Sequence, residues 1–461
     1  MTGLQKDLVQ LLSEAQVYHL PEDLLAYSCD GTYYITRRVP DAAVLPTSTE
    51  DVSKVLKYAF KHEIPITPRG AGSGLSGGCT PVKGGIVMDM KRMNHIVEVD
   101  GENLTARVEA GVVLRNFTNA LGKRGFFYPP DPQSASVCTL GGNIATRAGG
   151  PRGVKYGTTG NYVLGVEVVL PDGAVIKNGG KIFKQSVGYD ITHLMTGSEG
   201  TLGVITQADF RLLTLPPVHN LLIMSCETLE LAAQTVSTII ASGTTPAMLE
   251  YAAKVAVQAM NTMVPEPLSL DYEAFLLVDV DGTQAQVDND TKRIQEICKE
   301  MRVAVRVVDN PVQAAAYWNA RSRLAPLMLS MVKRMLIEDV TVPRNRFPEF
   351  IRGVQAVAAE TGTSVAVAGH SGDGNVHPSI LLNSTDEASQ RLAKETIDKI
   401  IRIGLELNGT ISGEHGIGLH KSEYLSWDIG EEQLQLLKRI KQAFDPKGIM
   451  NPGKIWVEGA N

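Results

Sequence analysis

The sequence predicts an α+β protein built from two or three domains. The chain has 461 residues, of which 43% are hydrophobic, and a single hydrophobic core rarely serves a chain of that length. Short strands alternate with glycine-rich loops in the first half, whereas amphipathic helices alternate with β-rich runs from about residue 217 onward. The second pattern is typical of a domain in which helices pack on an antiparallel sheet.

A domain boundary is predicted at Leu215-Pro216-Pro217, where glycine-rich loops and short strands give way to amphipathic helices and β-rich runs. We therefore divide the chain into a first domain over 1–216, a second domain over 217–420 and a C-terminal segment over 421–461. We expect the C-terminal segment to return to the first domain.

Three local assignments matter later. Residues 49–65 read as a helix that is capped by Thr49 and stopped by a proline. Residues 163–179 read as a β-hairpin, because a Pro-Asp-Gly turn separates two apolar runs. Residues 246–260 read as an amphipathic helix.

Composition excludes several classes of protein. A net charge of −6 gives no reason to expect a nucleic-acid partner. The five cysteines form no CxxC pair, and such scattered thiols fit a cytoplasmic protein better than a secreted one. The N-terminus lacks the apolar core of a signal peptide, and no run of 18 apolar residues exists, so any membrane association would be peripheral.

A glycine loop over 68–78, PRGAGSGLSGG, contains the pattern GxGxxG. That pattern binds a dinucleotide when it opens a helix, whose N-terminus then holds the pyrophosphate. Pro81 and two further glycines follow here, so no helix can start and the dinucleotide-fold interpretation is rejected. The exposed backbone N–H groups of such a loop can still bind an anion.

A second stretch over 129–160 is also rich in Gly, Pro, Ser and Thr. Long ordered loops without regular structure are usually functional. Two such loops in one domain predict an extended ligand that lies against backbone, and a dinucleotide with a flat ring system fits that description.

The glycine loop, the run over 140–173 and the SEGTLGVIT motif over 198–206 resemble the FAD-binding domain of the vanillyl-alcohol oxidase flavoprotein family. Within that family the chain looks most like the glycolate oxidase FAD-binding subunit and D-lactate dehydrogenase group. The resemblance extends from about residue 40 to the end. It implies a two-part FAD-binding domain, an α+β substrate (cap) domain with an antiparallel sheet, and FAD as cofactor.

The resemblance also implies where FAD binds, with the pyrophosphate on 69–77, the flavin along 130–150 and further contacts at 200–205. Some relatives attach FAD to a histidine in the first loop, and this loop has none, so we expect non-covalent FAD. The implied cofactor-binding residues are Arg69, Gly70, Ala71, Gly72, Ser73, Gly74, Leu75, Ser76, Pro130, Asp131, Thr139, Gly142, Asn143, Thr146, Gly149, Gly150, Gly200, Gly203, Ile205 and Asn451.

A candidate metal site lies at AGHSGDGNVHP, residues 368–378. Two β-rich runs flank Asp373-Gly374, a strong hairpin signal. With Asp-Gly as a two-residue turn, His370 would stand opposite His377, and opposed side chains share one face of the hairpin. That register is an assumption, and a one-residue slip would destroy the arrangement.

A third ligand is available in SGEHG, where Glu414 precedes His415. Two histidines and a carboxylate with an open position are typical of a catalytic metal site. The family resemblance implies the same set, with a metal on His370, His377 and Glu414 and with His415 as the acid/base. Three N/O ligands suit Zn²⁺, Fe²⁺ or Mn²⁺.

The resemblance further assigns Arg321, in the pattern WNAR, to the substrate carboxylate, which a guanidinium can hold with two parallel hydrogen bonds. Lys333 and Arg334 are possible helpers. Ser379 stands where relatives that use D-2-hydroxyglutarate have asparagine, which argues against a larger dicarboxylate. The expected reaction is therefore the oxidation of a small D-2-hydroxy acid, with D-lactate favoured and glycolate next. The D configuration comes from the resemblance alone.

The sequence leaves the electron acceptor open among an electron-transferring flavoprotein, an iron–sulfur subunit, a quinone and oxygen. We expect a dehydrogenase with a protein partner, because the chain carries no cysteine cluster for an iron–sulfur centre of its own. Two other classes stay open. They are a metallohydrolase that uses the histidine site, and a flavin-binding electron-transfer subunit without a substrate of its own.

Overall fold

The computed structural model describes residues 1–32 and 37–457, and these form two compact units. Unit 1 comprises Met1–Ala148, Thr158–Leu215 and Glu414–Asn461. Unit 2 comprises Gly149–Gly157 and Pro216–Gly413. Helices and mainly antiparallel sheets make up both units, so the predicted α+β class is confirmed. The boundaries at 216 and 420 stay predictions.

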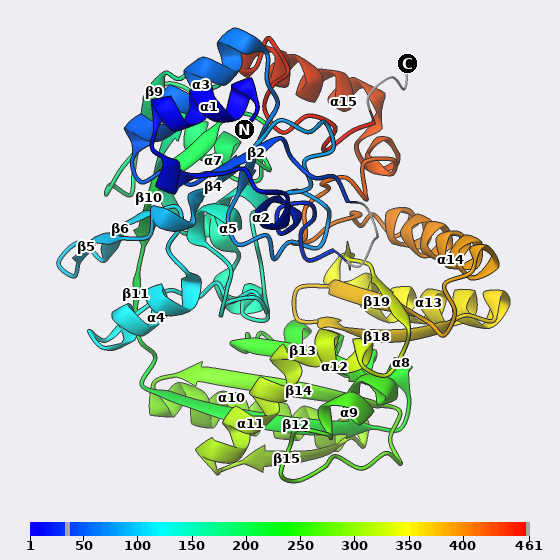
Figure 1. The fold of residues 1–461 in the computed structure, drawn as a ribbon. Coiled ribbons are helices and arrows are strands. Elements are labelled where there is room, and N and C mark those ends of the chain that lie inside the picture. Colours follow the sequence, from blue (N-terminus) through cyan, green and yellow to red (C-terminus); the bar gives the residue numbers. More distant parts are fainter. Residues whose placement is uncertain (33–36, 458–461) are drawn as a thin grey trace. The chain divides into compact units, whose positions relative to one another are not determined.

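The first sheet of unit 1 has the order β1-β2-β4-β3, with β2 and β3 parallel to β4. Its strands are β1 (Val17–Tyr18), β2 (Ala42–Val44), β3 (Ile66–Arg69) and β4 (Ile86–Asp89). Helices α1 (Gly3–Leu11) and α3 (Thr49–His62) pack beside it, as the blue part of Figure 1 shows. The last segment of the chain reaches this sheet, because Met450 forms a parallel bridge with Ile66.

The helix predicted over 49–65 exists, but its predicted cap was wrong by one residue. Ser48 is the N-cap, and its side chain accepts a hydrogen bond from the backbone N–H of Asp51. The hydroxyl of Thr49 instead donates to Glu167 at 2.6 Å. When two neighbouring hydroxyl residues stand at a helix start, the sequence alone cannot show which one is the N-cap, because one of them can bond to a distant residue instead.

The second sheet of unit 1 is antiparallel with the order β5-β6-β10-β8-β9. The hairpin predicted over 163–179 is confirmed as β8 and β9, with Val169 opposite Val175. The strands are β5 (Ile96–Asp100), β6 (Thr105–Glu109), β8 (Val163–Val169), β9 (Val175–Gly179) and β10 (Val204–Arg211).

The other elements of unit 1 cap or connect these sheets. They are η1 (Glu14–Gln16), α2 (Pro21–Leu25), η2 (Met90–Arg92), α4 (Leu114–Gly122), β7 (Phe126–Phe127), α5 (Leu140–Thr146), η3 (Thr159–Asn161), α7 (Ile191–Met195), β11 (Leu213–Thr214) and α15 (Leu425–Phe444).

Unit 2 is built on one antiparallel sheet of order β15-β12-β14-β13-β18-β19-β16, with β17 also paired to β19. The strands are β12 (Val218–Cys226), β13 (Met248–Ala253), β14 (Ala274–Gly282), β15 (Ala304–Val308), β16 (Arg334–Ile337), β17 (Val340–Thr341), β18 (Ser364–His370) and β19 (Asn375–Leu382). The helices of the green to orange part of Figure 1 are α8 (Leu229–Ala241), α9 (Lys254–Met260), α10 (Gln284–Met301), α11 (Pro311–Ser322), α12 (Leu324–Leu329), η4 (Arg344–Arg346), α13 (Phe347–Thr361) and α14 (Glu387–Glu406). The short helix α6 (Gly153–Tyr156) comes earlier in the chain and also belongs to unit 2.

The helix predicted over 246–260 was wrong in its first half. Residues Met248–Ala253 form β13, which pairs with β14 on one side and β18 on the other, and only Lys254–Met260 are helical. Every residue of β13 is buried. Alanine, leucine and glutamate favour a helix locally, but a strand buried on both faces follows its tertiary setting rather than that preference.

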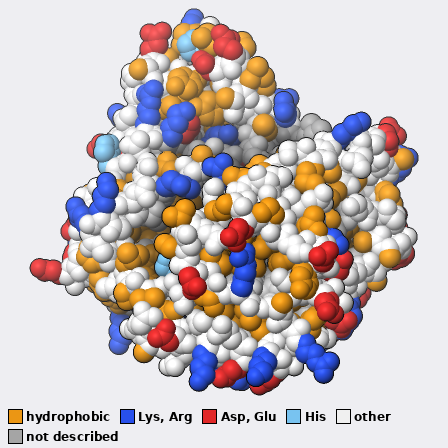
Figure 2. All heavy atoms as spheres, turned by 90° about the horizontal axis from the view of Figure 1, so that it is seen from below, with side chains coloured by type: hydrophobic (Ala, Val, Ile, Leu, Met, Phe, Trp, Pro, Cys, Tyr) orange, Lys and Arg blue, Asp and Glu red, His pale blue; other side chains and the backbone are white. Residues whose placement is uncertain are grey.

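Acidic and basic side chains are interspersed on the face that Figure 2 shows, without a large field of one sign. This is consistent with the modest net charge of −6. Within the described ranges, every helix is too short or too polar to cross a lipid bilayer.

Candidate functional site

A pocket opens in unit 1 beside the glycine loop. Its lining is mostly apolar and backbone-rich, with a few polar side chains such as Arg69 and Thr139, as in small-molecule and cofactor sites. Its walls come from the end of β3, from α5 and from the turn before β10, and glycine supplies much of the lining. Backbone without side chains can approach a ligand closely, which suits the pyrophosphate of a dinucleotide.

Eight of the predicted cofactor-binding residues line this pocket: Arg69, Gly70, Thr139, Gly142, Thr146, Gly200, Gly203 and Ile205. Ten others do not line it: Ala71, Gly72, Ser73, Gly74, Leu75, Ser76, Pro130, Asp131, Asn143 and Asn451. The predicted contacts at Gly149 and Gly150 fall in unit 2 rather than unit 1.

Sequence reasoning missed part of the lining, namely Pro68, Gly78, Cys79, Met90, Ala110, Gly141, Ala145, Ser198, Glu199 and Val204. Half of these directly neighbour a predicted residue, and Gly78, Cys79 and Ser198 lie two or three positions away, so extending each motif by up to three positions would have found them. Met90 and Ala110 follow strands and carry no motif, so no local signal marks them.

The predicted structureless loop over 129–160 is partly helical. Thr139 caps α5, and its side-chain oxygen accepts from the N–H of Gly142 at 3.3 Å. Gly70 packs against this cap so closely that a Cβ there would lie 2.2 Å from the Thr139 hydroxyl oxygen. The glycine-rich composition hid a short helix whose capping threonine fixes one wall of the pocket.

Two side chains brace the other walls. The amide nitrogen of Asn451 donates to the carbonyls of Gly78 and Glu199, at 3.0 and 2.8 Å. The carboxylate of Glu199 accepts from the N–H groups of Ile417 and Gly418, at 2.8 and 2.7 Å. Burial raises the pKa of Glu199, although these two hydrogen bonds act in the opposite direction.

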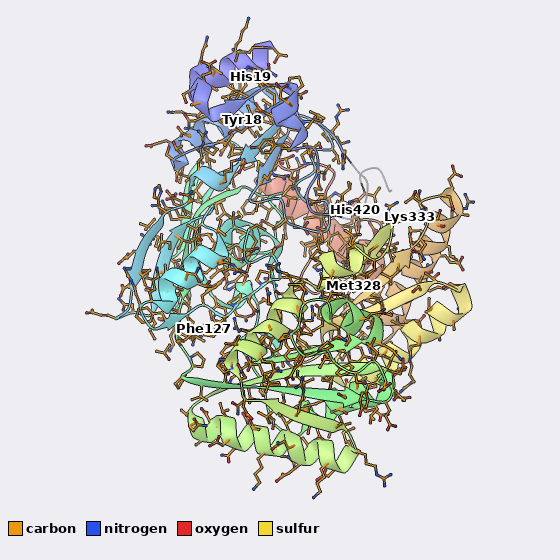
Figure 3. All side chains as sticks on the ribbon, turned by 60° about the horizontal axis from the view of Figure 1, so that its bottom comes forward. Tyr18, His19, Phe127, Met328, Lys333 and His420 are labelled. Atoms are coloured by element: carbon orange, nitrogen blue, oxygen red, sulfur yellow. The ribbon has the colours of Figure 1, made fainter. Side chains whose placement is uncertain are left out.

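The segment that carries His415 is fixed to the glycine loop within unit 1. The hydroxyl of Ser76 donates to the carbonyl of His415 at 3.1 Å, and the carbonyl of Ser76 accepts from the N–H of Leu419 at 2.8 Å. His420, labelled in Figure 3, lies so close to Gly77 that a Cβ there would be 2.9 Å from its Nε2. Ser76 therefore serves this segment rather than the pocket.

The histidine hairpin in unit 2 exists, but its predicted register was wrong. The strands β18 and β19 pair His370 with Asn375 and Ala368 with His377, so the turn has four residues instead of two. The slip is two residues, and the side-chain period of a strand is also two, so both histidines stay on one face. They form a diagonal pair with ring centroids 5.2 Å apart.

Both imidazoles place Nδ1 against an acceptor oxygen. The Nδ1 of His370 lies 2.7 Å from a carboxylate oxygen of Glu250, and the Nδ1 of His377 lies 3.3 Å from the carbonyl of Glu338. These oxygens can only accept, so each Nδ1 must donate a proton, which in the neutral form of the ring places the lone pair on Nε2. A pair of Nε2 lone pairs on one sheet face fits a metal ion.

Arg321 is buried in the last turn of α11, with only 2% of the residue exposed. Its Nη2 lies 2.5 Å from the second carboxylate oxygen of Glu250. Burial would raise the pKa of Glu250, but the charge of Arg321 and the hydrogen bond from His370 outweigh that effect and lower it. The Nε and Nη2 of Arg321 make no well-aligned hydrogen bond to any described residue.

Asp339 forms a second buried carboxylate beside His377, 3.8 Å from its Nδ1. It accepts from the amide of Asn375 at 2.7 Å and from the hydroxyl of Ser412 at 2.8 Å. Ser412 is two residues before Glu414, so this bond anchors the end of unit 2 from which the predicted ligand follows along the chain.

The predicted residues thus divide between the units. His370, His377 and Arg321 belong to unit 2, whereas Glu414 and His415 begin the last segment of unit 1. Lys333, the residue before β16, is exposed (Figure 3), and Ser379 is buried.

Two family models match the chain. Residues 40–179 match the FAD binding domain, and residues 215–455 match the C-terminal domain of FAD linked oxidases. The glycolate oxidase subunit GlcD of Bacillus subtilis is 38% identical over 95% of this chain and 93% of its own length. A D-lactate dehydrogenase of Anaerostipes hadrus is 36% identical over 90% of this chain and 89% of its own.

Solved structures share the fold at low identity. p-Cresol methylhydroxylase aligns with a TM-score of 0.83 at 19% identity, over all of this chain and 98% of that one. The 4-ethylphenol oxidase of Gulosibacter chungangensis aligns with a TM-score of 0.82 at 19% identity, over all of this chain and 99% of that one. The predicted vanillyl-alcohol oxidase type of fold is confirmed. The chain therefore belongs to the FAD-linked oxidases, as an FAD-dependent oxidoreductase of the glycolate oxidase subunit and D-lactate dehydrogenase group.

Proposed function

We propose that this protein oxidises a small D-2-hydroxy acid to the 2-oxo acid, with D-lactate favoured over glycolate. The names of the two relatives support a hydroxy-acid substrate. The observation that carries the proposal is a pair of imidazoles that both hold Nδ1 against an acceptor oxygen, near a buried arginine in unit 2. Metal-assisted chemistry on a small anion needs such a combination.

Arg321 is the proposed anchor for the substrate carboxylate. Its Nε and Nη2 lie on one edge of the guanidinium, the edge that can hold a carboxylate with two parallel hydrogen bonds. Nε has no hydrogen-bonded acceptor among the described residues, whereas Nη2 is ion-paired with Glu250 without a well-aligned hydrogen bond, so an incoming carboxylate would satisfy Nε and share Nη2. This contact would orient the hydroxyl-bearing carbon.

His370, His377 and Glu414 are the proposed ligands of one divalent cation, Zn²⁺, Fe²⁺ or Mn²⁺. Such an ion polarises a bound hydroxyl and lowers its pKa. The ligand set needs the two histidines held with Nε2 toward a common point, and the acceptors at each Nδ1 favour that orientation.

His415 is the proposed base that takes the hydroxyl proton. Its imidazole is of the type that titrates near neutrality, and its backbone is held by Ser76. Oxidation releases one proton and one hydride equivalent from the substrate, and FAD, when bound, takes up the hydride equivalent. The proton remains with His415 until solvent removes it.

The electrons must then leave the flavin, and we propose a protein or quinone acceptor. Relatives named as subunits support a partner protein, either an electron-transferring flavoprotein or an iron–sulfur subunit. The cytoplasmic location predicted from the cysteine pattern stays a prediction.

The test is anaerobic bleaching of the purified flavoprotein. D-Lactate, L-lactate, glycolate and D-2-hydroxyglutarate are added in turn to wild type, to His415→Ala and to metal-stripped protein. His95→Ala is the matched control, because His95 is an exposed histidine of unit 1. We expect D-lactate to bleach wild type and the control only. A flavoprotein that no acid bleaches would indicate an electron-transfer subunit, and a colourless protein with hydrolase activity would indicate a metallohydrolase.

A further inference from the structure

We propose that Glu250 is a positioning residue that sets the metal-binding nitrogen of His370 and the substrate-binding edge of Arg321 together. This inference rests on the proposed function and extends it to a residue that carries no motif. Glu250 is completely buried, and its two carboxylate oxygens are divided between those two side chains.

The sheet brings Glu250 to this place. β13 pairs with β18 so that Tyr251 stands opposite Gly369 and Ala252 opposite Ala368. One step further along the same register sets Glu250 opposite His370. Tyr251 points to the other face of the sheet, where its ring packs edge-on against Phe347 of α13. Strand alternation therefore directs Glu250 to the face that carries both histidines.

The contact with His370 determines the tautomer. A carboxylate at 2.7 Å from Nδ1 accepts its proton and leaves the ring lone pair on Nε2. Carboxylates in this relation to a metal-binding histidine orient the ring and make the ligand more basic. The equivalent acceptor for His377 is a neutral backbone carbonyl at 3.3 Å, so Glu250 gives the stronger of the two restraints.

The contact with Arg321 determines the charge balance. Both side chains are almost fully buried, and a buried cation without a counter-charge is strongly destabilising. Glu250 neutralises the guanidinium in the resting protein while leaving Nε without a hydrogen-bonded partner among the described residues. The arginine is thus held through Nη2, while Nε, the other donor on the proposed substrate edge, keeps no hydrogen-bonded partner among the described residues.

The variant Glu250→Gln distinguishes a positioning role of Glu250 from that of an ordinary structural ion pair. In Glu250→Gln the amide oxygen would face the cation Arg321, so the amide NH₂ would face Nδ1 of His370. A donor at that position requires the lone pair on Nδ1 and moves the proton to Nε2, the nitrogen that the metal needs. Loss of a merely structural pair would lower stability without selectively weakening metal binding.

The experiment measures Zn²⁺ binding by the metal-stripped full-length flavoprotein, in competition with a chromogenic chelator. Asp279→Asn is the matched control, because Asp279 is a buried acid of the same sheet that pairs with His219 instead. We expect Glu250→Gln to weaken Zn²⁺ binding by about 10- to 100-fold. The control should stay within about 2-fold of wild type. FAD content should be unchanged in both, since the pocket lies in unit 1.

The second readout is steady-state kinetics with saturating Zn²⁺. Loss of the Arg321 restraint should raise KM for D-lactate more than it lowers kcat. Glu250→Asp keeps the charge but is one methylene shorter, so it should recover most of the Zn²⁺ affinity and only part of the KM. It also serves as the working variant if Glu250→Gln does not fold.

The outcomes separate this inference from the function on which it rests. If His370→Ala abolishes Zn²⁺ binding while Glu250→Gln binds as tightly as wild type, Glu250 is not a positioning residue and the proposed function stands. If wild type and His370→Ala bind Zn²⁺ equally, the metal site itself is wrong and both proposals fall.

Discussion

The contact between Gly70 and the cap of α5 makes a quantitative prediction about FAD binding. In Gly70→Ala the new Cβ would lie 2.2 Å from the hydroxyl oxygen of Thr139, more than 1 Å inside ordinary contact. Both residues line the pocket, so relief of the clash must displace one of its walls. Overpacking of this kind costs about 1–3 kcal/mol, which corresponds to an affinity for FAD lower by about 5- to 150-fold.

The cause can be isolated with Thr139→Ala. This change removes the oxygen that clashes, and the nearest neighbour of the new Cβ is then the Cβ of residue 139 at 3.5 Å, an ordinary contact. By itself Thr139→Ala removes the helix cap and costs about 1 kcal/mol of folding stability. In that background Gly70→Ala should cost almost nothing, so the two changes should couple by about 1–3 kcal/mol.

The assay is the fluorescence of FAD titrated into the deflavinated protein, for wild type, both single variants and the double variant. Gly122→Ala is the control, because a Cβ at Gly122 meets nothing within 4 Å. Equal losses from Gly70→Ala in both backgrounds would refute the steric argument, since the loss would then have a cause other than the Thr139 hydroxyl.

Three further predictions concern buried polar groups. Glu199→Gln keeps one acceptor oxygen for two N–H groups, so turnover of the loaded enzyme should fall about 10-fold while FAD content is retained. Burial would raise the pKa of Glu167, but hydrogen bonds, one of them from Lys177, outweigh it and lower this pKa. The charged Glu167 therefore stabilises the folded state above about pH 4.3, and this contribution is lost as the pH falls. Glu167→Gln should therefore flatten the acid limb of thermal melts recorded between pH 3 and 7. Asn375→Asp sets a second carboxylate against Asp339 and should destabilise unit 2 by about 1–3 kcal/mol in urea unfolding, whereas an unchanged midpoint would exclude the observed hydrogen bond.

The histidine hairpin shows how a sequence can predict the right residues for a site from a wrong strand register. Asp373-Gly374 correctly indicated a turn, but turn length depends on contacts outside the hairpin. Here the backbone carbonyl of Leu249 accepts from Gly372 N–H and from the Ser371 hydroxyl, which supports a four-residue turn. Because the error was an even number of residues, the face was still right.

The cofactor pocket was predicted in outline for a related reason. Glycine-rich motifs mark places where backbone approaches a ligand, and those near Gly70, Gly142 and Gly200 do line the pocket. The motifs cannot show which residues of a loop turn away from it. Ser76, in the middle of the first loop, instead bonds with the segment around His415, more than 300 residues away in sequence.

The acids that orient the site lie beyond local sequence signals altogether. Glu250 sits in a segment whose composition favours a helix, and as a helical residue it would have counted as a solvent-facing charge. Only the pairing of β13 with β18 brings it beside His370, and only burial on both faces of the sheet makes its charge need Arg321. Ligands and bases occur in short motifs because their spacing must suit one ion or one substrate. The residues that hold them need only reach one atom each, so any segment that the sheet topology brings close can supply them, and their identity follows from the fold rather than from the motif.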